Sequence, residues 1–416
     1  MIFRLILTKI AKTLQMTEFP KVFVCLPVMQ EEAYLEAITN SLKHQDYPDV
    51  QLVICINQPE SYRHIPEKKH ICIENEKALK YFRKEFPNAI IIDRASQGIG
   101  WDDKFYGVGW ARKVCLDEAS SMAYPSDILL SMDADTEYPK DYITKVVHGF
   151  SMHPQALGMA IPYYHKQTPN EEANKAILRY EIYMRYFAVN MLRTGQYYAF
   201  TAIGSAMACT GKAYKKIRGL TPHKSGEDFY FLQKLRKSGS IIIWADTLAW
   251  PAARFSDRVF FGTGPAMIKG SSGNWDSYPI YPARFFDEVA TTIQLFPILF
   301  ENDQPTPMDD FLNSTYGDSK FWQKIRKSCK TEKRFIQACH ESIDGLKILQ
   351  FLRYRLNQEF SEDYSNLQTF FNDNFQNFLP DSEFSGNFYT LVGLDYIREL
   401  LFNIEFSERN RIRILK

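Results

Sequence analysis

An alternation of apolar runs and amphipathic stretches between residues 21 and 135 constrains the fold of this chain more than any other feature. Four apolar runs rich in β-branched residues are typical of buried strands, and they span 21–28, 50–57, 89–93 and 127–135. Helical patterns separate them, at 31–45, 76–86 and 109–123. Strands that alternate with helices in this way predict an α/β fold, with a mostly parallel sheet covered on both faces.

Beyond residue 136 the alternation loosens. The sequence predicts an amphipathic helix at 171–193, a strand or hairpin at 197–211, a helix at 226–239 and a strand at 240–250. Residues 252–280 are rich in Gly, Ser and Arg and predict a loop, whereas the chain after about 281 is helical and aromatic. We expect three parts: an N-terminal amphipathic segment (1–16), an α/β domain (17–280) and a helical C-terminal region (281–416).

Composition is that of a globular protein with a large core. Hydrophobic residues make up 45% and charged residues 24% of the 416 residues. The net charge of +1 gives no overall attraction to nucleic acid, so we expect none as a partner. Seven scattered cysteines without a CxxC pair indicate reduced thiols in the cytoplasm and argue against a zinc site.

The first sixteen residues are apolar at helical spacing, but basic residues interrupt them too often for a membrane span. A helix here can lie on a membrane surface, or it can pack against the body of the protein. A third alternative is that translation begins at Met16. We therefore expect a cytoplasmic protein, with peripheral contact at the inner face of the membrane through residues 1–16 as an open alternative.

Two aspartates follow the fourth apolar run, in the stretch ILLSMDADTEYPKDY (128–142). Asp133 and Asp135 stand at the carboxyl end of a predicted parallel strand, where α/β sheets bind ligands. Mg²⁺ and Mn²⁺ bind one or two carboxylates together with substrate phosphates. The alternative is an acidic turn that caps the helix beginning near Pro139. Their position favours Asp133 and Asp135 as ligands of Mg²⁺ or Mn²⁺.

Four stretches in this order resemble the inverting glycosyltransferases of the GT-A fold, family 2. They are LPVMQEEAYLEAITNSLKHQDYP, GVGWARKVCLDEA, LLSMDADTEYP and GEDFYFLQKLRKSG. The resemblance covers about residues 20–250, and although each motif is loose, their order and spacing together are fairly specific. It implies a Rossmann-like GT-A sheet flanked by helices, to which the C-terminal helices are an addition.

The resemblance implies that the loop after the first strand holds the nucleotide base and ribose. In this chain the loop offers Pro27, Val28, Gln30 and Glu31, although an acidic residue there also suits the start of a helix. Relatives often have an acidic residue after the second strand, where this chain has Asn57. A substitute candidate, at the end of the third strand, is Asp93, which can equally be a turn residue.

Basic residues near the expected diphosphate come from two places. Arg112 and Lys113, in GVGWARK, can face the phosphates, with glycines that let the helix end approach a ligand; a solvated basic turn is the alternative. Arg254 and Arg258 can clamp the departing diphosphate. The glycines that follow, at 262, 264 and 270, suit the hinge of a lid.

The second acidic pair opens the predicted helix at 226–239. By resemblance Asp228 is the general base that removes the proton of the acceptor hydroxyl, and Glu227 positions the acceptor or donor. The alternative is that both residues are simply favoured in a first helical turn. Relatives often have a third metal ligand, commonly His, but no His stands between 224 and 339. We expect His165 and His223 to be structural.

Together these residues predict a metal-assisted glycosyltransferase. It would use a nucleotide-sugar donor and a glycan, lipid-linked or small-molecule acceptor, in surface polysaccharide or glycoconjugate synthesis. One alternative is a nucleotidyltransferase acting on a sugar phosphate, although the segment PVMQEEAY lacks the glycine and basic residue that such an enzyme needs after its first strand. Another is a non-catalytic protein that binds a glycan or nucleotide-sugar and retained the fold.

Overall fold

The structure is a computed structural model of the chain, and it describes residues 19–256, 262–317, 320–379 and 384–416. The predicted amphipathic segment 1–16 and the predicted diphosphate ligand Arg258 lie outside the described residues.

A central sheet of eight strands organises the molecule, in the order β10-β8-β6-β7-β4-β1-β2-β3. In chain order the strands are β1 (Val22–Val28), β2 (Val50–Asn57), β3 (Ile90–Arg94), β4 (Ile128–Ser131), β6 (Gly158–Ala160), β7 (Met207–Thr210), β8 (Ile241–Ile242) and β10 (Ile414–Leu415). β1 pairs in parallel with β2 and β4, β2 with β3, and β6 with β8. β7 and β10 run antiparallel to their neighbours. A second, two-stranded sheet joins β5 (Thr136–Glu137) to β9 (Trp250–Pro251).

Both faces of the central sheet are buried, because side chains alternate along each strand. In β1, Phe23 and Cys25 belong to one apolar core, and Val24 and Leu26 belong to the other. The described helices that pack against the first face include α4 (Val108–Met122), α7 (Gly211–Lys216) and α8 (Glu227–Ser238). Three cover the second: α2 (Leu35–Lys43), α3 (Lys69–Glu85) and α5 (Tyr142–Met152).

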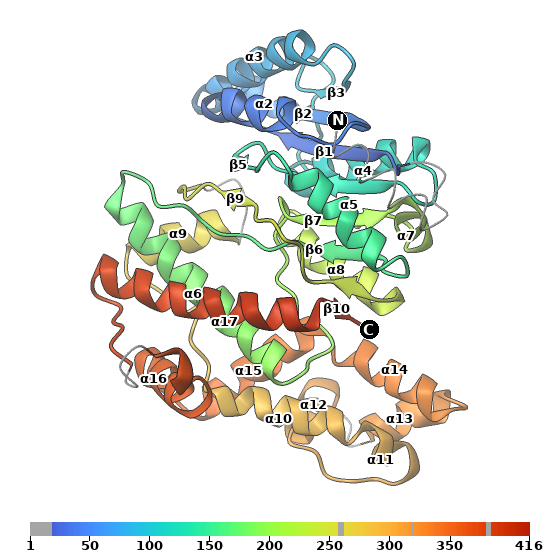
Figure 1. Cartoon of the computed structure of the whole chain (residues 1–416), viewed down its shortest axis with the longest axis vertical. Coiled ribbons are helices and arrows are strands. Elements are labelled where there is room, and N and C mark those ends of the chain that lie inside the picture. Colours follow the sequence, from blue (N-terminus) through green and yellow to red (C-terminus); the bar gives the residue numbers. More distant parts are fainter. Residues whose placement is uncertain (1–18, 257–261, 318–319, 380–383) are drawn as a thin grey trace, which may run out of the picture.

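A long helix, α6 (Glu171–Arg193), lies beside the sheet and is packed along α17 (Leu391–Ile412) and α9 (Thr263–Ser271) (Figure 1). The Asn170 side chain caps α6 by accepting a hydrogen bond of 3.0 Å from the Ala173 backbone N–H.

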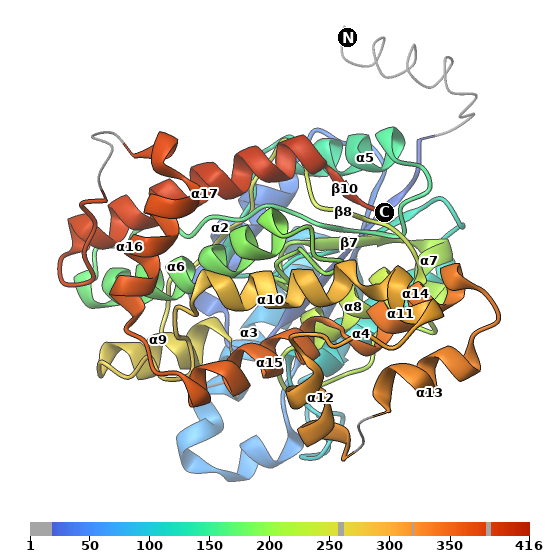
Figure 2. The same ribbon diagram turned by 90° about the horizontal axis from the view of Figure 1, so that it is seen from below.

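Helices of the C-terminal region gather at the end of the molecule away from β1 and β2 (Figure 1). In chain order they are α10 (Ala283–Gln294), α11 (Phe296–Glu301), α12 (Asp309–Tyr316), α13 (Phe321–Ser328), α14 (Glu332–Ser342), α15 (Gly345–Gln358) and α16 (Asp363–Asn374). In the view from below, α10, α12 and α15 lie in front (Figure 2). The chain then returns through α17 to the sheet, where Ile414 of β10 pairs with Ile242 of β8. Residues after 280 thus share one apolar core with the sheet.

The predicted α/β fold, with its mostly parallel sheet and its helical C-terminal region, is confirmed. Several boundaries were wrong, however. The fourth strand ends at Ser131 and not at 135, and the predicted strand or hairpin at 197–211 contains only β7. The predicted strand at 240–250 is two short strands, β8 and β9, in different sheets. Residues 252–280, predicted as a loop, contain α9, which is stable there because Ala266 and Met267 are buried against α6.

Within the part of the chain that the structure describes, no helix is both long enough and apolar enough to cross a bilayer.

Candidate active site

A cleft of about 780 Å³ opens at the carboxyl ends of β1, β2 and β4. Pro27 and Val28 line it from the end of β1, Asn57 from the end of β2, and Asp133 from the turn after β4. Residues of α6, α9 and α15 line it on the side away from these strands. The position agrees with the rule that parallel sheets bind ligands where their strands end.

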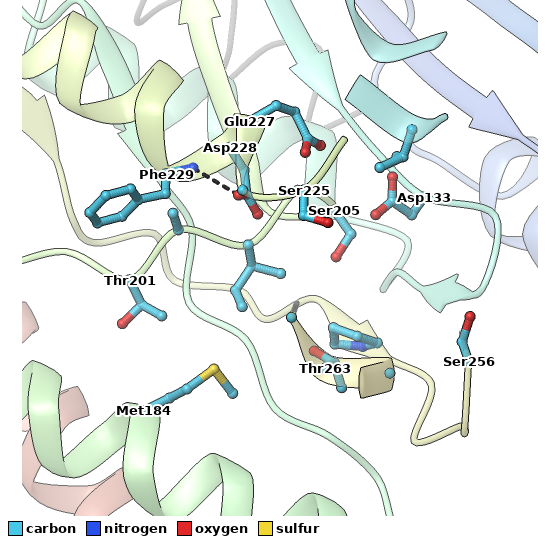
Figure 3. A pocket seen from close by; sticks show the side chains of 18 of the residues that line it. Asp133, Met184, Thr201, Ser205, Ser225, Glu227, Asp228, Phe229, Ser256 and Thr263 are labelled. Carbon is cyan, nitrogen blue, oxygen red and sulfur yellow. Dashed lines mark hydrogen bonds between the residues drawn. The ribbon is translucent and has the colours of Figure 1, made fainter. Parts of the chain in front are cut away.

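The two acidic pairs meet in this one cleft, although they are far apart in the sequence. Asp133 and Asp135 follow β4, whereas Glu227 and Asp228 form the first turn of α8, and all four line the cleft. In Figure 3, Asp133, Glu227 and Asp228 lie around the same space. The turn before α8 is made possible by Gly226, whose φ of 73° is in the left-handed region.

Arg112 joins the two pairs from beneath the cleft. Its side chain is 2% exposed, and its Nε donates to Glu227 Oε1 at 3.0 Å. Its Nη1 and Nη2 donate to the two carboxylate oxygens of Asp133, at 2.9 and 3.3 Å. Nη1 also donates to the Gly204 carbonyl at 2.9 Å, and a Cβ at position 204 would lie 2.4 Å from Nη2. Glycine at 204 therefore gives the guanidinium its space.

Neighbouring carboxylates stabilise the protonated form of Arg112. Burial by itself would lower the pKa of Arg112, but Asp133 and Glu227 raise that pKa above its ordinary value. Every nitrogen of the guanidinium is engaged within the protein. In the structure Arg112 thus contacts carboxylates of the protein, and its predicted contact with a diphosphate stays a prediction.

Asp228 is the carboxylate of this cleft that is most suited to proton transfer. Burial raises its pKa to about 7, with a further contribution from neighbouring Glu227 and an opposing effect of Arg112. Its Oδ1 accepts a hydrogen bond of 2.7 Å from the Phe229 backbone N–H. A carboxylate with a pKa near neutrality can accept a proton at pH 7 and release it again.

Arg254 forms a second ionic group in the cleft. Its Nη2 lies 2.6 Å from Asp135 Oδ2 and 2.7 Å from Glu31 Oε1. Pairing of β5 with β9 brings these residues together, because the Ala252 N–H donates to the Asp135 carbonyl at 3.0 Å. Burial, reinforced by Asp135, raises the pKa of Glu31 well above its ordinary value, although Arg254 opposes the shift.

Asp135 is the residue of this end of the cleft that could contribute a carboxylate to a divalent cation, and the described residues offer no complete cage. Among the described residues, no group of three or more His, Cys, Asp and Glu side chains could hold a metal ion. Both oxygens of Asp133 accept hydrogen bonds from Arg112, whereas Asp135 is paired through Oδ2 with Arg254. Mg²⁺ and Mn²⁺ are commonly bound by one protein carboxylate, with phosphate oxygens and water molecules as the other ligands.

Charge balance at this end also favours a cation. Five carboxylates line it, namely Glu31, Asp133, Asp135, Glu227 and Asp228, against the two guanidinium groups of Arg112 and Arg254. Burial raises the pKa of Glu31 and of Asp228, so protons neutralise part of this negative charge. An anionic ligand entering this end would still meet the remaining carboxylates unless a cation entered with it.

Three predicted site residues do not line the cleft. The Gln30 backbone N–H donates to Asn75 Oδ1 at 2.9 Å. Asp93 accepts hydrogen bonds from the backbone N–H groups of residues 95 and 96, as a turn residue does. Lys113 is paired with Asp117 at 2.7 Å, one turn further along α4.

The glycines of GVGWARK serve packing within the protein. Gly107 has a φ of 104° and precedes the first turn of α4. A Cβ at Gly109 would lie 2.1 Å from the backbone oxygen of His223. Gly109 thus lets α4 pack closely against the loop that leads into Glu227 and Asp228, whereas the sequence had suggested close packing against a ligand.

Sequence reasoning missed a whole wall of the cleft. It comes from three helices that carry no motif, and it includes Tyr183, Met184, Phe187, Leu346, Leu349 and Arg353. The helical pattern of 171–193 was visible, but an aromatic helix face looks the same whether it meets a core or a cleft.

His165 was also left out of the predicted site, yet it lines the cleft. Its Nδ1 lies 2.8 Å from Glu181 Oε2. Burial would raise the pKa of Glu181, but Arg185 and His165 together lower it to about 2. Arg185 Nη1 also donates to Glu405 of α17 at 2.6 Å. His165 therefore belongs to a buried ionic network that fastens α17 behind this wall.

No protein-family model matches the sequence, and no curated protein matches it. Among solved structures, residues 1–349 of S. aureus TarS in complex with UDP-GlcNAc are 13% identical, with 94% of this chain and 91% of that chain covered and a TM-score of 0.37. The mannosyltransferase PcManGT from Pyrobaculum calidifontis, in complex with GDP-Man and Mn²⁺, is also 13% identical, with 88% and 90% covered and a TM-score of 0.39. At these values the similarity establishes neither function nor substrate.

Proposed function

We propose that this chain is an inverting glycosyltransferase of the GT-A type, family 2, acting in surface polysaccharide or glycoconjugate synthesis. It would transfer a sugar from a nucleoside-diphosphate donor to an acceptor hydroxyl. One observation carries the proposal: Asp228, with a pKa raised to about 7, lines the same cleft as Asp133 and Asp135. A proton acceptor thereby lies in the same cavity as carboxylates suited to a sugar diphosphate and its cation.

The chemical step then has one bond formed and one broken. The acceptor oxygen attacks the anomeric carbon while its proton passes to a carboxylate oxygen of Asp228. The bond from that carbon to the diphosphate oxygen breaks, and the nucleoside diphosphate leaves with the electron pair. Attack from the face opposite to the leaving group inverts the anomeric configuration, through an oxocarbenium-like state.

The nucleoside end of the donor is proposed to lie against the ends of β1 and β2. Pro27, Val28, Glu31 and Asn57 line the cleft there. Asn57 is held by its Nδ2, which donates to the Val28 carbonyl at 2.9 Å. Asp133 is proposed to accept a hydrogen bond from a ribose or sugar hydroxyl, since hydrogen bonds from Arg112 to both of its oxygens fix the carboxylate in place.

A bound Mg²⁺ or Mn²⁺ ion would supply positive charge against the diphosphate as that group departs. Asp135 is the residue that would hold it, with Arg254 released from Asp135 to contact a phosphate. Arg112 acts in this scheme as a positioning residue. It holds Glu227 and Asp133 from below, and Glu227 in turn contributes to the raised pKa of Asp228.

The location proposed for this activity is the cytoplasm. All seven cysteines are free, and six of them are buried, which supports a reducing compartment.

A panel of nucleotide-sugars tests the proposal directly. Thermal stabilisation and release of nucleoside diphosphate are measured for each donor, with and without Mn²⁺, for the wild type and Asp228→Asn. A glycosyltransferase shows stabilisation by one donor, and release in the wild type that Asp228→Asn abolishes. Asp246→Asn, an exposed partner of Lys145, is the control and keeps full release.

The same panel separates the alternatives. A nucleotidyltransferase would release pyrophosphate when given a nucleoside triphosphate and a sugar phosphate. A non-catalytic protein would be stabilised by a nucleotide-sugar without releasing any nucleoside diphosphate from it. Either result contradicts the proposed transfer reaction.

A further inference from the structure

The cleft carries opposite charge at its two ends. The end described above holds five carboxylates and two arginines. The other end is lined by α6, α9, α15 and the segment 277–278, and we call it the aromatic end. Among the described residues that line the aromatic end, there is no carboxylate, and the charged side chains are Lys269 and Arg353.

These two cations converge on one residue. Lys269 Nζ is 3.4 Å from Ser277 Oγ, and Arg353 Nη2 is 3.3 Å from the Ser277 carbonyl oxygen. Lys269 comes from α9 and Arg353 from α15, so two separate helices bring positive charge to the same place. Both side chains are exposed.

Neither cation is neutralised by the described part of the protein. Among the described residues no ion pair joins a carboxylate to Lys269 or Arg353, although Asp276 is the chain neighbour of Ser277 and Arg353 interacts with the Tyr281 hydroxyl. The contrast with nearby Arg179, which is paired with Asp363, is clear. An unpaired Lys and Arg at one point of a cleft wall are suited to an oxyanion from outside.

The surroundings indicate what else the ligand carries. Tyr183 and Tyr278 line the aromatic end with ring centroids 5.3 Å apart, and Phe187 and Leu349 line it beside them. Aromatic faces of this kind contact the apolar faces of sugar rings and carbon chains, while hydroxyl groups bind at their edges. In Figure 1, α15 lies on the other side of α6 from β1 and β2, so this end is separate from the proposed nucleoside end.

We propose that the aromatic end binds the acceptor, and that this acceptor is an anionic saccharide whose phosphate or carboxylate is held by Lys269 and Arg353. The assignment rests on the proposed function, and it names the acceptor class for the same cleft. A neutral acceptor would leave both cations unused and would gain nothing from their convergence.

Binding of simple probes tests the assignment. Glucose 6-phosphate, glucuronate and glucose are titrated into the full chain at one ionic strength, and binding is followed by ligand-observed NMR. We expect at least one anion to bind about tenfold more tightly than glucose. The tighter of the two anions identifies the acceptor group as a phosphate or a carboxylate.

The variants are Lys269→Gln, Arg353→Gln and their combination, with Lys347→Gln of the same helix α15 as the control. Each single substitution should weaken anion binding about threefold, and the double variant should bind the anion no better than glucose. Lys347 packs over the rings of Phe311 and Tyr316 and does not line the cleft, so its variant should bind like the wild type.

Three results would overturn the assignment: equal binding of glucose and both anions, no detectable binding of either anion, or an unchanged double variant. Stabilisation by UDP is measured on the same proteins. If the double variant loses stabilisation by UDP, the cations serve the donor and the assignment is wrong. If no nucleotide stabilises even the wild type, the proposed function fails, whereas the anion result stands by itself.

Discussion

Arg112 and Glu227 are 115 positions apart in the sequence, and their side chains meet in a buried hydrogen bond of 3.0 Å. The same guanidinium binds both oxygens of Asp133. The two acidic pairs of the cleft are therefore joined through one guanidinium group. A substitution of Arg112 removes a hydrogen-bond donor from both pairs.

Replacing Arg112 by Met should destabilise the protein strongly. Glu227 is 5% exposed, so the substitution leaves a carboxylate buried without its cation. We expect a loss of about 3–5 kcal/mol in the free energy of unfolding, measured by urea denaturation at pH 8. The combined variant Arg112→Met/Glu227→Gln should recover part of this loss.

The neighbouring residue provides the control for that experiment. Lys113 is part of a partly exposed pair with Asp117, so Lys113→Met should cost about 1 kcal/mol or less. A loss from Arg112→Met no larger than that from Lys113→Met would show that the buried ionic structure is not important for stability.

Asp228→Asn should abolish transfer and yet stabilise the fold at pH 8. The pKa of Asp228 is raised from 3.8 to about 7, so the folded protein favours the protonated form. The wild type consequently loses stability as pH rises from about 4 to 7, and the loss is complete above 7. We expect Asp228→Asn to gain about 1 kcal/mol in unfolding free energy at pH 8, and nothing at pH 4. A variant that is less stable than the wild type at pH 8 would contradict this reading.

The activity of the wild type should rise with pH to a midpoint near 7. Asp228 can accept the acceptor proton only when it is ionised, so kcat/KM should fall about tenfold per pH unit below that midpoint. The measurement is donor turnover between pH 5.5 and 8.5, at constant ionic strength. A rate that is flat across this range would exclude Asp228 as the titrating base.

Arg254→Gln should strengthen the binding of Mn²⁺ in the absence of a donor. The Arg254 guanidinium lies 2.6 Å from Asp135 and competes with a metal for that carboxylate. We expect a gain in Mn²⁺ affinity of about threefold to tenfold by isothermal titration, together with weaker stabilisation by whichever nucleoside diphosphate stabilises the wild type. Lys145→Gln, which breaks an exposed pair with Asp246, is the control. Unchanged Mn²⁺ affinity would show that Asp135 is not a ligand.

The parts of the fold that could be predicted are those with strong periodicity. β1, β2 and α4 were visible because buried parallel strands and an amphipathic helix leave uninterrupted patterns. α9 was missed because its sequence, TGPAMIKGS, is poor in strong helix formers, and its stability comes from packing on α6. Pairs as short as β8 and β9 depend on their partners in space, which a single sequence does not display.

The candidate site likewise has a part that the sequence predicts and a part that it does not. The order of the motifs along the chain predicted that Asp133 and Asp228 would meet in one cleft. Nothing in the sequence around Arg112 predicted that its side chain would be buried between them. Arg353 had no motif around it, and its role depends on α15 lying against the cleft. Two contacts join α8 to the start of α15: the Gly345 N–H donates to Gln233 Oε1 at 2.7 Å, and Lys237 Nζ lies 2.6 Å from Asp344 Oδ2. No sequence motif marks these residues.

The strand β10 has a consequence for how the chain is made. β8 lies between β6 and β10, so its outer edge is covered only by residues that a ribosome adds after the entire helical region. Until α17 and β10 have emerged, the nascent polypeptide presents an open edge of backbone N–H and C=O groups to other chains. A fragment ending before residue 391 should therefore self-associate more readily than the full chain, because it lacks the strand that covers this edge.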